Sequence, residues 1–150
     1  MAEDRSYIEA NTRERERLRA LIDGLDDDAL ALPVNEFWTV AAVLGHMAYW
    51  DIRVLVLAEK ISSGEPWVAG DAEPDGDWLN DTTRLLIHEI EPRRAAQFAL
   101  KIAEQCDALV AELPLARVLP RDPVSPIWPA RSDHRAEHLD EIEAALKARG

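Results

Sequence analysis

Histidines at three positions have the spacing and the setting of metal ligands. His134 and His138 lie four residues apart in the sequence DHRAEHLDEIEAAL, which puts both imidazoles on one face of a helix, one turn apart. His46 stands inside the apolar sequence WTVAAVLGHMAYWD, where a buried imidazole needs a polar partner. Three neutral imidazoles around one divalent ion leave a coordination position for water or substrate, as in catalytic zinc sites.

The histidines also have a second interpretation. A His-x-x-x-His pair arises easily by chance, and all three residues could be core or boundary histidines that are hydrogen-bonded to the backbone or to carboxylates. The remaining histidine, His88, precedes Glu89 in a short predicted helix and is interpreted as a surface or boundary residue. The residues alone leave both interpretations of His46, His134 and His138 in place.

Amphipathic patterns predict the helices that would position these histidines. We expect helices over residues 4–25, from the capping residue Thr39 to about Ile61, over residues 92–113 with proline in the first turn, and from Ser132 or Asp133 almost to the end. The sequence NDTTRLLIHEI predicts a further short helix. The inward residues predicted for the helix over 92–113 are Phe98, Ala99, Ile102, Cys106, Leu109 and Leu113.

The connections between these helices have distinct compositions. Residues 62–78 are acidic and contain three glycines, which predicts a solvated loop ending near Trp78. Five prolines between Pro114 and Pro129 exclude regular structure there. No segment alternates with the period of a strand, and no repeat is present. The sequence therefore predicts an all-α protein, a four-helix bundle in one domain over residues 1–150.

Composition limits the partners and the compartment. With a net charge of −12, we expect neither nucleic acid nor an anionic membrane as a partner. The apolar run from Val40 to Leu57 is interrupted by three polar residues, so no membrane span is expected. The N-terminal sequence has no signal-peptide core, and the single cysteine, Cys106, excludes an intramolecular disulfide; it is expected to pack as a small apolar side chain. We therefore expect a cytoplasmic protein.

Two motifs resemble the DinB/YfiT-like superfamily. One is LPVNEFWTVAAVLGHMAYWD, an apolar helix that opens on Trp-Thr-Val and contains a histidine, and the other is the His-x-x-x-His helix about ninety residues later. The sequences LIDGLDDDALALP and WLNDTTRLL are also similar to the N-terminal domain of mycothiol-dependent maleylpyruvate isomerases. The resemblance covers nearly the whole chain.

The resemblance implies a four-helix bundle of up-down-down-up order, with the acidic loop 62–78 as a long crossover between its second and third helices. It also implies a divalent metal held by His46, His134 and His138. In the mycothiol branch the first residue of the terminal pair is an acid, so the chain follows the all-histidine pattern here. The isomerases carry an extra C-terminal domain that these 150 residues lack, and isomerase activity is not expected.

Several members of the superfamily are similar to thiol S-transferases, which join a low-molecular-weight thiol such as bacillithiol or mycothiol to an electrophile. The resemblance thus suggests a metal-dependent thiol transferase or hydrolase that acts on a small-molecule substrate. Three imidazoles suit zinc, nickel, copper or iron, and of these we expect zinc or nickel. We expect Trp38, Met47 and Trp50 to line the electrophile site, and Asn11 and Arg15 to hold the carboxylates of an anionic thiol.

Two hypotheses of other classes stay beside the enzyme. In the first, the bundle is a non-enzymatic stress protein that binds or sequesters a small hydrophobic compound. In the second, metal loads only in the purified protein and the bundle serves oligomerisation. A homodimer would match the oligomeric state of many members of the superfamily. Turnover that is lost on chelation distinguishes the enzyme from both.

Overall fold

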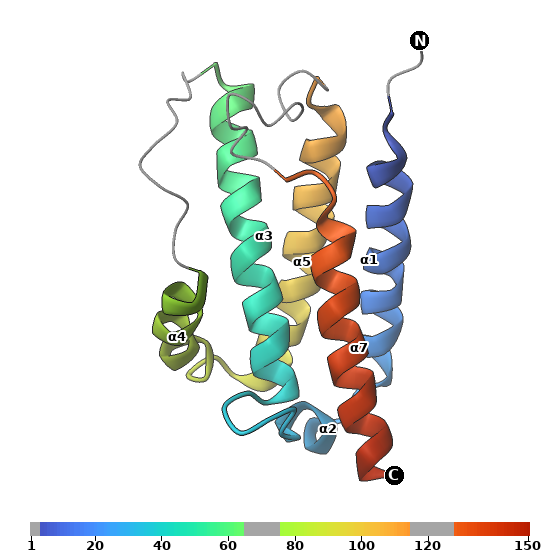
Figure 1. The fold of residues 1–150 in the computed structure, drawn as a ribbon, viewed down its shortest axis with the longest axis vertical. Coiled ribbons are helices and arrows are strands. Elements are labelled where there is room, and N and C mark those ends of the chain that lie inside the picture. Colours follow the sequence, from blue (N-terminus) through green and yellow to red (C-terminus); the bar gives the residue numbers. More distant parts are fainter. Residues whose placement is uncertain (1–3, 65–75, 115–127) are drawn as a thin grey trace.

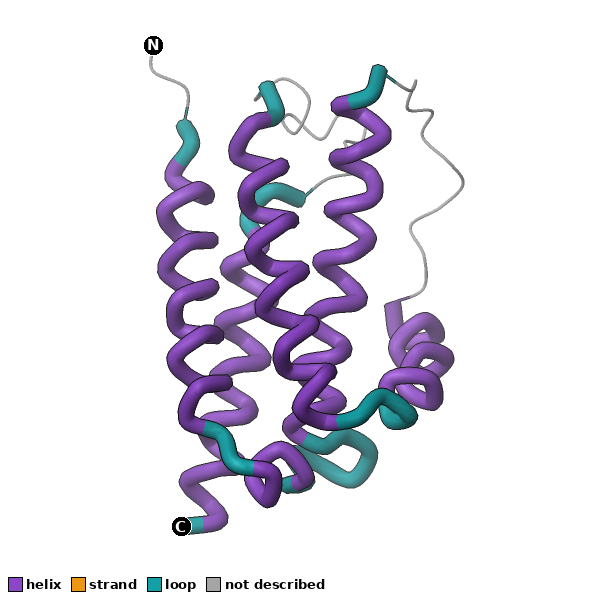
Figure 2. Tube along the Cα trace, turned by 180° about the vertical axis from the view of Figure 1, so that it is seen from behind, coloured by secondary structure: helices purple, strands orange, loops and turns teal. Residues whose placement is uncertain are grey.

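The protein is all-helical over the residues that the computed structural model describes, which are 4–64, 76–114 and 128–150. Within these ranges there is no strand, only an isolated bridge between Pro33 and Thr39 (Figure 2). The predicted all-α fold is therefore confirmed. The helices are α1 (Ser6–Gly24), α2 (Asp27–Ala31), α3 (Val40–Ser62), α4 (Gly76–Ile87), α5 (Pro92–Glu112) and α7 (Arg131–Arg149).

Four long helices, α1, α3, α5 and α7, form the bundle, and α4 lies outside it against α3 (Figure 1). Helices α1 and α7 run in the same direction, and α3 and α5 run in the opposite one. Side-chain contacts agree with these directions: Arg17 reaches Glu143 near the end of α7, whereas Arg19 pairs with Glu104 in the middle of α5. Antiparallel packing of α3 on α7 brings the two histidine motifs together.

Helix α3 forms the centre of the core. Its N-terminus is capped by Thr39, whose Oγ1 accepts a hydrogen bond of 3.1 Å from the backbone N–H of Ala42, as predicted. In the described part of the chain, α3 is the one helix that is long and apolar enough to cross a membrane. However, 61% of its most apolar stretch is buried inside the protein, as expected for a core helix.

Several predicted details were wrong. Phe98 was expected to point inward but is 40% exposed, because α5 turns the faces of Ala95, Ala99 and Ile102 toward α3. The last helix begins at Arg131, slightly earlier than predicted. The short helix α2, which follows α1, was not predicted; Asp26 caps it by accepting a hydrogen bond from the backbone N–H of Ala29.

The segment between α3 and α5 also differs from the prediction. The acidic loop was expected to run to residue 78 and the short helix to follow it, whereas α4 already begins at Gly76 and ends at Ile87. Most of the predicted crossover loop, and most of the proline-rich segment after Pro114, lie outside the described residues. Pro92 occupies the first turn of α5 as predicted, and Glu91 caps that helix by accepting from the N–H groups of Arg93 and Arg94.

Helix α4 approaches α3 closely at a glycine. A Cβ atom on Gly45 would lie 2.7 Å from Cγ2 of Ile87, the buried residue of α4. Since a real Cβ contact is never this short, the missing side chain at Gly45 is what allows α4 to lie against α3. This approach sets Asn80 of α4 beside Trp50 of α3, at the edge of the histidine cluster.

Gly45→Ala is expected to lower the free energy of unfolding by about 1 kcal/mol. The methyl group would gain about 1 kcal/mol of helix propensity, but overpacking against the stiff β-branched Ile87 costs about 1–3 kcal/mol. Gly24→Ala in α1 is the matched control, because its Cβ would meet no atom within 4 Å. Urea unfolding of both variants checks the prediction, and a Gly45→Ala protein as stable as the control would contradict it.

Candidate metal centre

Three imidazole nitrogens converge between α3 and α7. The Nε2 atom of His46 lies 3.1 Å from that of His138 and 3.3 Å from that of His134, and the two α7 nitrogens are 3.0 Å apart. Nitrogens bound tetrahedrally to zinc at about 2.0–2.1 Å are themselves roughly 3.3 Å apart. The three residues are the group of possible metal ligands found in the described part of the chain. Their spacing fits a single divalent ion.

Hydrogen bonding to other groups does not account for this cluster. A neutral Nε2 offers either one proton or one lone pair, so three mutually close Nε2 atoms cannot satisfy one another. The Nδ1 atoms of His46 and His134 are buried and have no hydrogen-bond partner among the described residues. Only His138 has a carboxylate partner, Glu141, whose Oε2 lies 3.2 Å from its Nδ1. The geometry therefore favours a metal site over hydrogen-bonded core histidines.

His46 and His134 are held in the neutral form that metal binding requires. Burial, followed by the charge of His138, lowers the pKa of His46 to about 4. Burial also lowers the pKa of His134 to about 2, with further contributions from the charges of His138, His46, Arg131 and Arg135. Both rings are thus unprotonated at neutral pH and present lone pairs to an incoming cation.

These lowered pKa values predict that the metal-free protein loses stability as the pH falls. An unfolded histidine has a pKa near 6.5, so below this pH the unfolded chain binds more protons than the folded one. Each such histidine then lowers the free energy of unfolding by about 1.4 kcal/mol for every pH unit of acidification. When the pH falls from 7 to 5, the free energy of unfolding of His134→Gln is expected to decrease by about 2 kcal/mol less than that of the native chain. Urea unfolding at both pH values tests this. Carboxylates titrate in both proteins, so equal losses would contradict the prediction.

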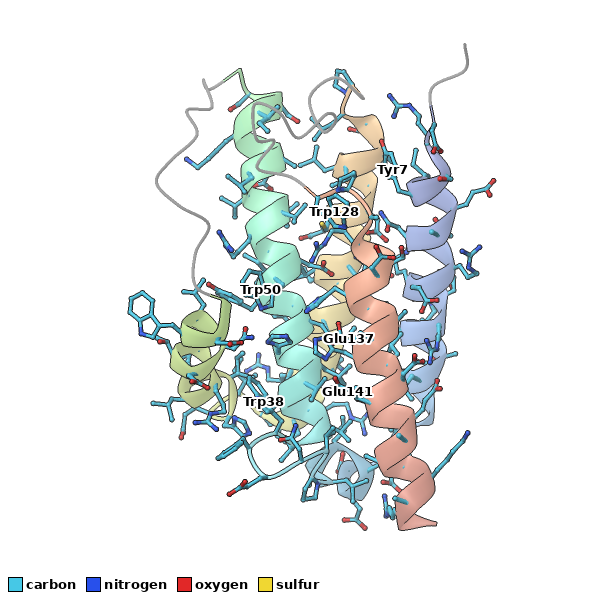
Figure 3. All side chains as sticks on the ribbon, viewed as in Figure 1. Tyr7, Trp38, Trp50, Trp128, Glu137 and Glu141 are labelled. Atoms are coloured by element: carbon cyan, nitrogen blue, oxygen red, sulfur yellow. The ribbon has the colours of Figure 1, made fainter. Side chains whose placement is uncertain are left out.

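A cavity of about 190 Å³ lies beside the histidines. Trp38 stands against His46, with ring centres 5.4 Å apart, and Trp50 lies 6.4 Å from the same imidazole (Figure 3). Glu141 of α7 reaches the cavity from the other side. The cavity is therefore a small chamber with aromatic and polar walls next to the cluster. Its lining residues are Asn35, Trp38, Val43, His46, Asn80, His138 and Glu141.

Other residues predicted to bind substrate lie elsewhere. Met47 is fully buried in the hydrophobic core, because it lies about 100° around α3 from His46. Asn11 and Arg15 line a different cavity, of about 370 Å³, between α1 and α5. The structure thus brings Trp38 and Trp50 to the histidines but does not bring Met47, Asn11 or Arg15 there.

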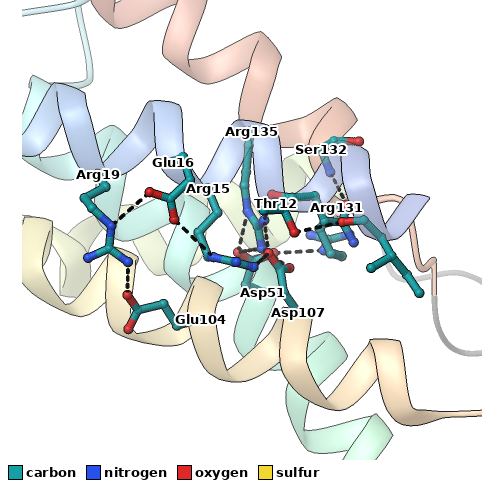
Figure 4. Close-up of polar contacts among 12 residues, drawn as sticks. Thr12, Arg15, Glu16, Arg19, Asp51, Glu104, Asp107, Arg131, Ser132 and Arg135 are labelled. Atoms are coloured by element: carbon teal, nitrogen blue, oxygen red, sulfur yellow. Dashed lines mark hydrogen bonds and ion pairs between the residues drawn. The ribbon is translucent and has the colours of Figure 1, made fainter. Parts of the chain in front are cut away.

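A buried network of ion pairs (Figure 4) adjoins the histidine cluster. Arg135 is fully buried and makes a bidentate pair with Asp107, at 2.7 and 2.8 Å, and a second pair with Asp51 at 3.0 Å. Arg131 donates to Asp51 at 2.8 Å, and Arg15 donates to Asp107 at 2.8 Å. The network joins α1, α3, α5 and α7, and Arg135 is the neighbour of His134 in the chain.

Charge compensation explains how Arg135 stays ionised inside the protein. Burial alone would lower the pKa of Arg135, but the hydrogen bonds to Asp107 and the charge of Asp51 outweigh it and raise that pKa. The sequence carried a weak signal, since Asp51 is the single acid in the apolar middle of its helix and Arg131 and Arg135 are four residues apart. Sequence reasoning treated Asp51 only as an interruption of an apolar run.

Asn11 belongs to the same buried layer. Its amide donates to the backbone oxygen of Pro129 at 2.8 Å, and its Oδ1 accepts from the N–H of Ser132 at 2.9 Å. The side chain therefore satisfies backbone groups where α7 begins, a task that no residue at the start of α7 performs. Its position explains why a polar residue lies on the inward stripe of α1.

Cys106 is buried beside this network and is expected to be unreactive. Burial, and then the charge of Asp51, raises the pKa of its thiol to about 12. At pH 8 the folded protein should not react with Ellman's reagent, whereas the urea-unfolded chain should release one equivalent of chromophore. Rapid reaction of the folded protein would contradict this. The predicted role of Cys106 as a packed apolar side chain agrees with its burial.

His88 lies apart from the cluster. It is exposed, as predicted, and its Nδ1 lies 2.8 Å from the backbone oxygen of Arg84 one turn earlier. Its ring stands 5.6 Å from that of Trp38, and it is not part of the three-histidine group. His88 is consequently a suitable control for substitutions of the other histidines.

Comparison with known proteins agrees with this geometry. Residues 10–147 match the sequence model of the DinB superfamily, and this stretch includes all three clustered histidines. No curated protein and no solved structure matches the chain. Since the match extends over far more than half of its length, the chain belongs to the DinB superfamily, the family that its two histidine motifs resemble.

Proposed function

We propose that the protein is a metal-dependent enzyme that transfers a low-molecular-weight thiol to a small electrophile. The convergence of three Nε2 atoms, 3.0–3.3 Å apart and beside a cavity, carries this proposal. Three protein ligands that leave a coordination position for a further molecule are characteristic of catalytic rather than structural zinc. A divalent ion at such a site supplies a nucleophile at neutral pH by lowering the pKa of a thiol or water.

The chain's own residues would hold and orient this chemistry. His46, His134 and His138 would hold the ion, and Glu141 accepts the Nδ1–H of His138 and so fixes the tautomer that leaves Nε2 unprotonated. Neutral imidazoles leave the positive charge of the ion undiminished. Trp38 and Val43 give the cavity apolar faces that limit water around the reacting molecule, and Trp50 packs near His46.

Zinc or nickel is the metal that we propose. Imidazole ligands suit both ions, and the all-nitrogen set contains no carboxylate of the kind that magnesium or calcium prefers. Glu141 contacts His138 rather than completing the ligand group. Elemental analysis of protein purified without an affinity tag should find about one such ion per chain.

A turnover assay tests the proposed function. The purified protein would be incubated with bacillithiol or mycothiol and monochlorobimane, whose chloride the thiol sulfur displaces to give a fluorescent thioether. We expect conjugation above the uncatalysed rate, lost on treatment with a chelator and restored by zinc or nickel. His134→Ala should be inactive, and His88→Ala should retain activity because His88 lies outside the cluster.

The same assay separates the enzyme from a protein that binds or sequesters a small molecule. The cavity favours that second candidate to the extent that Trp38 gives it an aromatic wall independently of any metal. Quenching of tryptophan fluorescence by the electrophile without turnover for either thiol, with metal loaded, would contradict the transferase and support binding alone.

A further inference from the structure

Two asparagines in the cavity wall have amide oxygens that are already occupied. Oδ1 of Asn80, on α4, accepts a hydrogen bond of 3.0 Å from the indole Nε1–H of Trp50. Oδ1 of Asn35 accepts from the backbone N–H groups of Phe37 and Trp38, at 2.9 and 3.0 Å. Both asparagines line the cavity next to the three histidines. The acceptor end of each amide is therefore taken up by the protein.

These bonds fix which end of each amide is available to a ligand. The indole and backbone N–H groups can only donate, so the atom that faces them must be the oxygen, and a flipped amide is excluded. Each Nδ2 group keeps two N–H donors, and no group within residues 4–64, 76–114 and 128–150 accepts from them. Asn80 is half-buried, whereas Asn35 is exposed at the rim.

We propose that this cavity selects small uncharged molecules that carry a hydrogen-bond-accepting oxygen, above all carbonyl compounds, and that Asn80 determines this specificity. The inference rests on the proposed function, because it names the class of electrophile that the transferase would take. Asn80 donates to the carbonyl oxygen, and Asn35 adds a weaker contact at the rim. The carboxylate of Glu141, which also lines the cavity, disfavours anionic ligands.

The dimensions of the cavity and its donors set the expected selectivity. A volume of about 190 Å³ accommodates a single six-membered ring. A site with placed donors disfavours an analogue that lacks the acceptor, because the half-buried donor of Asn80 is then left without a partner. One such hydrogen bond corresponds to about a tenfold difference in the dissociation constant.

Asn80→Asp reverses the hydrogen-bonding character of the site with almost no change in shape. The new carboxylate can still accept from Trp50, so the packing of α4 is retained, but it presents an acceptor to the cavity in place of two donors. Gln105→Glu is the matched control, since it makes the same change of charge at an exposed position of α5.

The probes are cyclohexanone and cyclohexylamine, which share a ring but offer an acceptor and a charged donor. Binding would be followed by NMR on ¹⁵N-labelled full-length protein, with and without zinc, through the side-chain amide signals of Asn80 and Asn35. We expect cyclohexanone to shift the Asn80 signal. In Asn80→Asp, cyclohexanone should bind about tenfold more weakly and cyclohexylamine more tightly, while Gln105→Glu changes neither.

Unaltered cyclohexanone binding in Asn80→Asp, or no shift of the Asn80 amide in the native protein, would overturn the proposal. The Trp50 indole N–H signal shows in the same spectra whether the variant keeps its fold. Cyclohexanone has no leaving group, so its binding is measured without turnover. Failure of the thiol-transfer assay would accordingly leave the specificity result standing, and failure of the specificity would leave turnover unaffected.

Discussion

Replacing Asp51 by alanine is expected to lower the free energy of unfolding by about 3–5 kcal/mol. Among the described residues, Asp51 is the one carboxylate paired with buried Arg131, and it is also one of the two carboxylates that neutralise Arg135. Removing it leaves positive charge buried among the four long helices, where water cannot replace the lost contacts. Because the free energy of unfolding of a domain of this size is about 5–15 kcal/mol, the loss would clearly lower the urea concentration at the midpoint of unfolding.

Two further substitutions show whether burial is the cause. Asp51→Asn keeps the shape and one acceptor oxygen, so it should cost less than the alanine variant. Asp140→Ala removes a carboxylate that also pairs with an arginine, Arg17, but whose side chain is 72% exposed, and it should cost no more than about 1 kcal/mol. Equal effects of the Asp51 and Asp140 alanine variants would show that the buried ion pairs contribute no more to the free energy of unfolding than an exposed one.

Loss of any one clustered histidine is expected to weaken zinc binding by more than about 100-fold. Each contributes one of only three Nε2 atoms, and the loss of even an outer hydrogen-bond partner of a ligand costs about 10–100-fold in affinity. His46→Ala and His138→Ala would be titrated with zinc in competition with a chromophoric chelator. The native chain provides the reference in the same buffer.

Glu141 and His88 provide graded controls for this measurement. Glu141→Gln should weaken binding only about 10–100-fold, because it removes the carboxylate that orients His138 and leaves all three nitrogens. His88→Ala should bind zinc as the native chain does. If His46→Ala and His88→Ala bound zinc equally well, the cluster would not be the metal site.

The sequence alone was sufficient for the long helices and for the choice of the three histidines. The amphipathic patterns of these helices extend over many residues and are regular, and residues such as Thr39 and Pro92 mark where helices begin. The spacing of His134 and His138 fixed their common face without knowledge of any other helix. His46 was added because it lies in the most apolar helix, which in a small bundle must lie near the others, although no local pattern tells which of its faces meets the helix of His134 and His138.

What the sequence could not supply depends on contacts between distant segments. Phe98 was predicted to point inward because the pattern of apolar residues on a helix does not tell which of them face a neighbouring helix and which face solvent. Arg15 looked like a ligand-binding residue, but it is paired with Asp107, 92 positions further on. The donors of Asn80 depend on the approach of α4 at Gly45, which no periodicity reveals.

The parallel course of the first and last long helices also bears on how the nascent chain folds. Arg17 and Glu143 are 126 positions apart, and His46 meets His138 across 92. Contacts of such long sequence separation form slowly, because much chain entropy is lost before they contribute. During synthesis, Asp51 has no arginine from α7 until residues 131–135 leave the ribosome. We therefore expect the bundle to close, and metal affinity to arise, only after the last helix has been made.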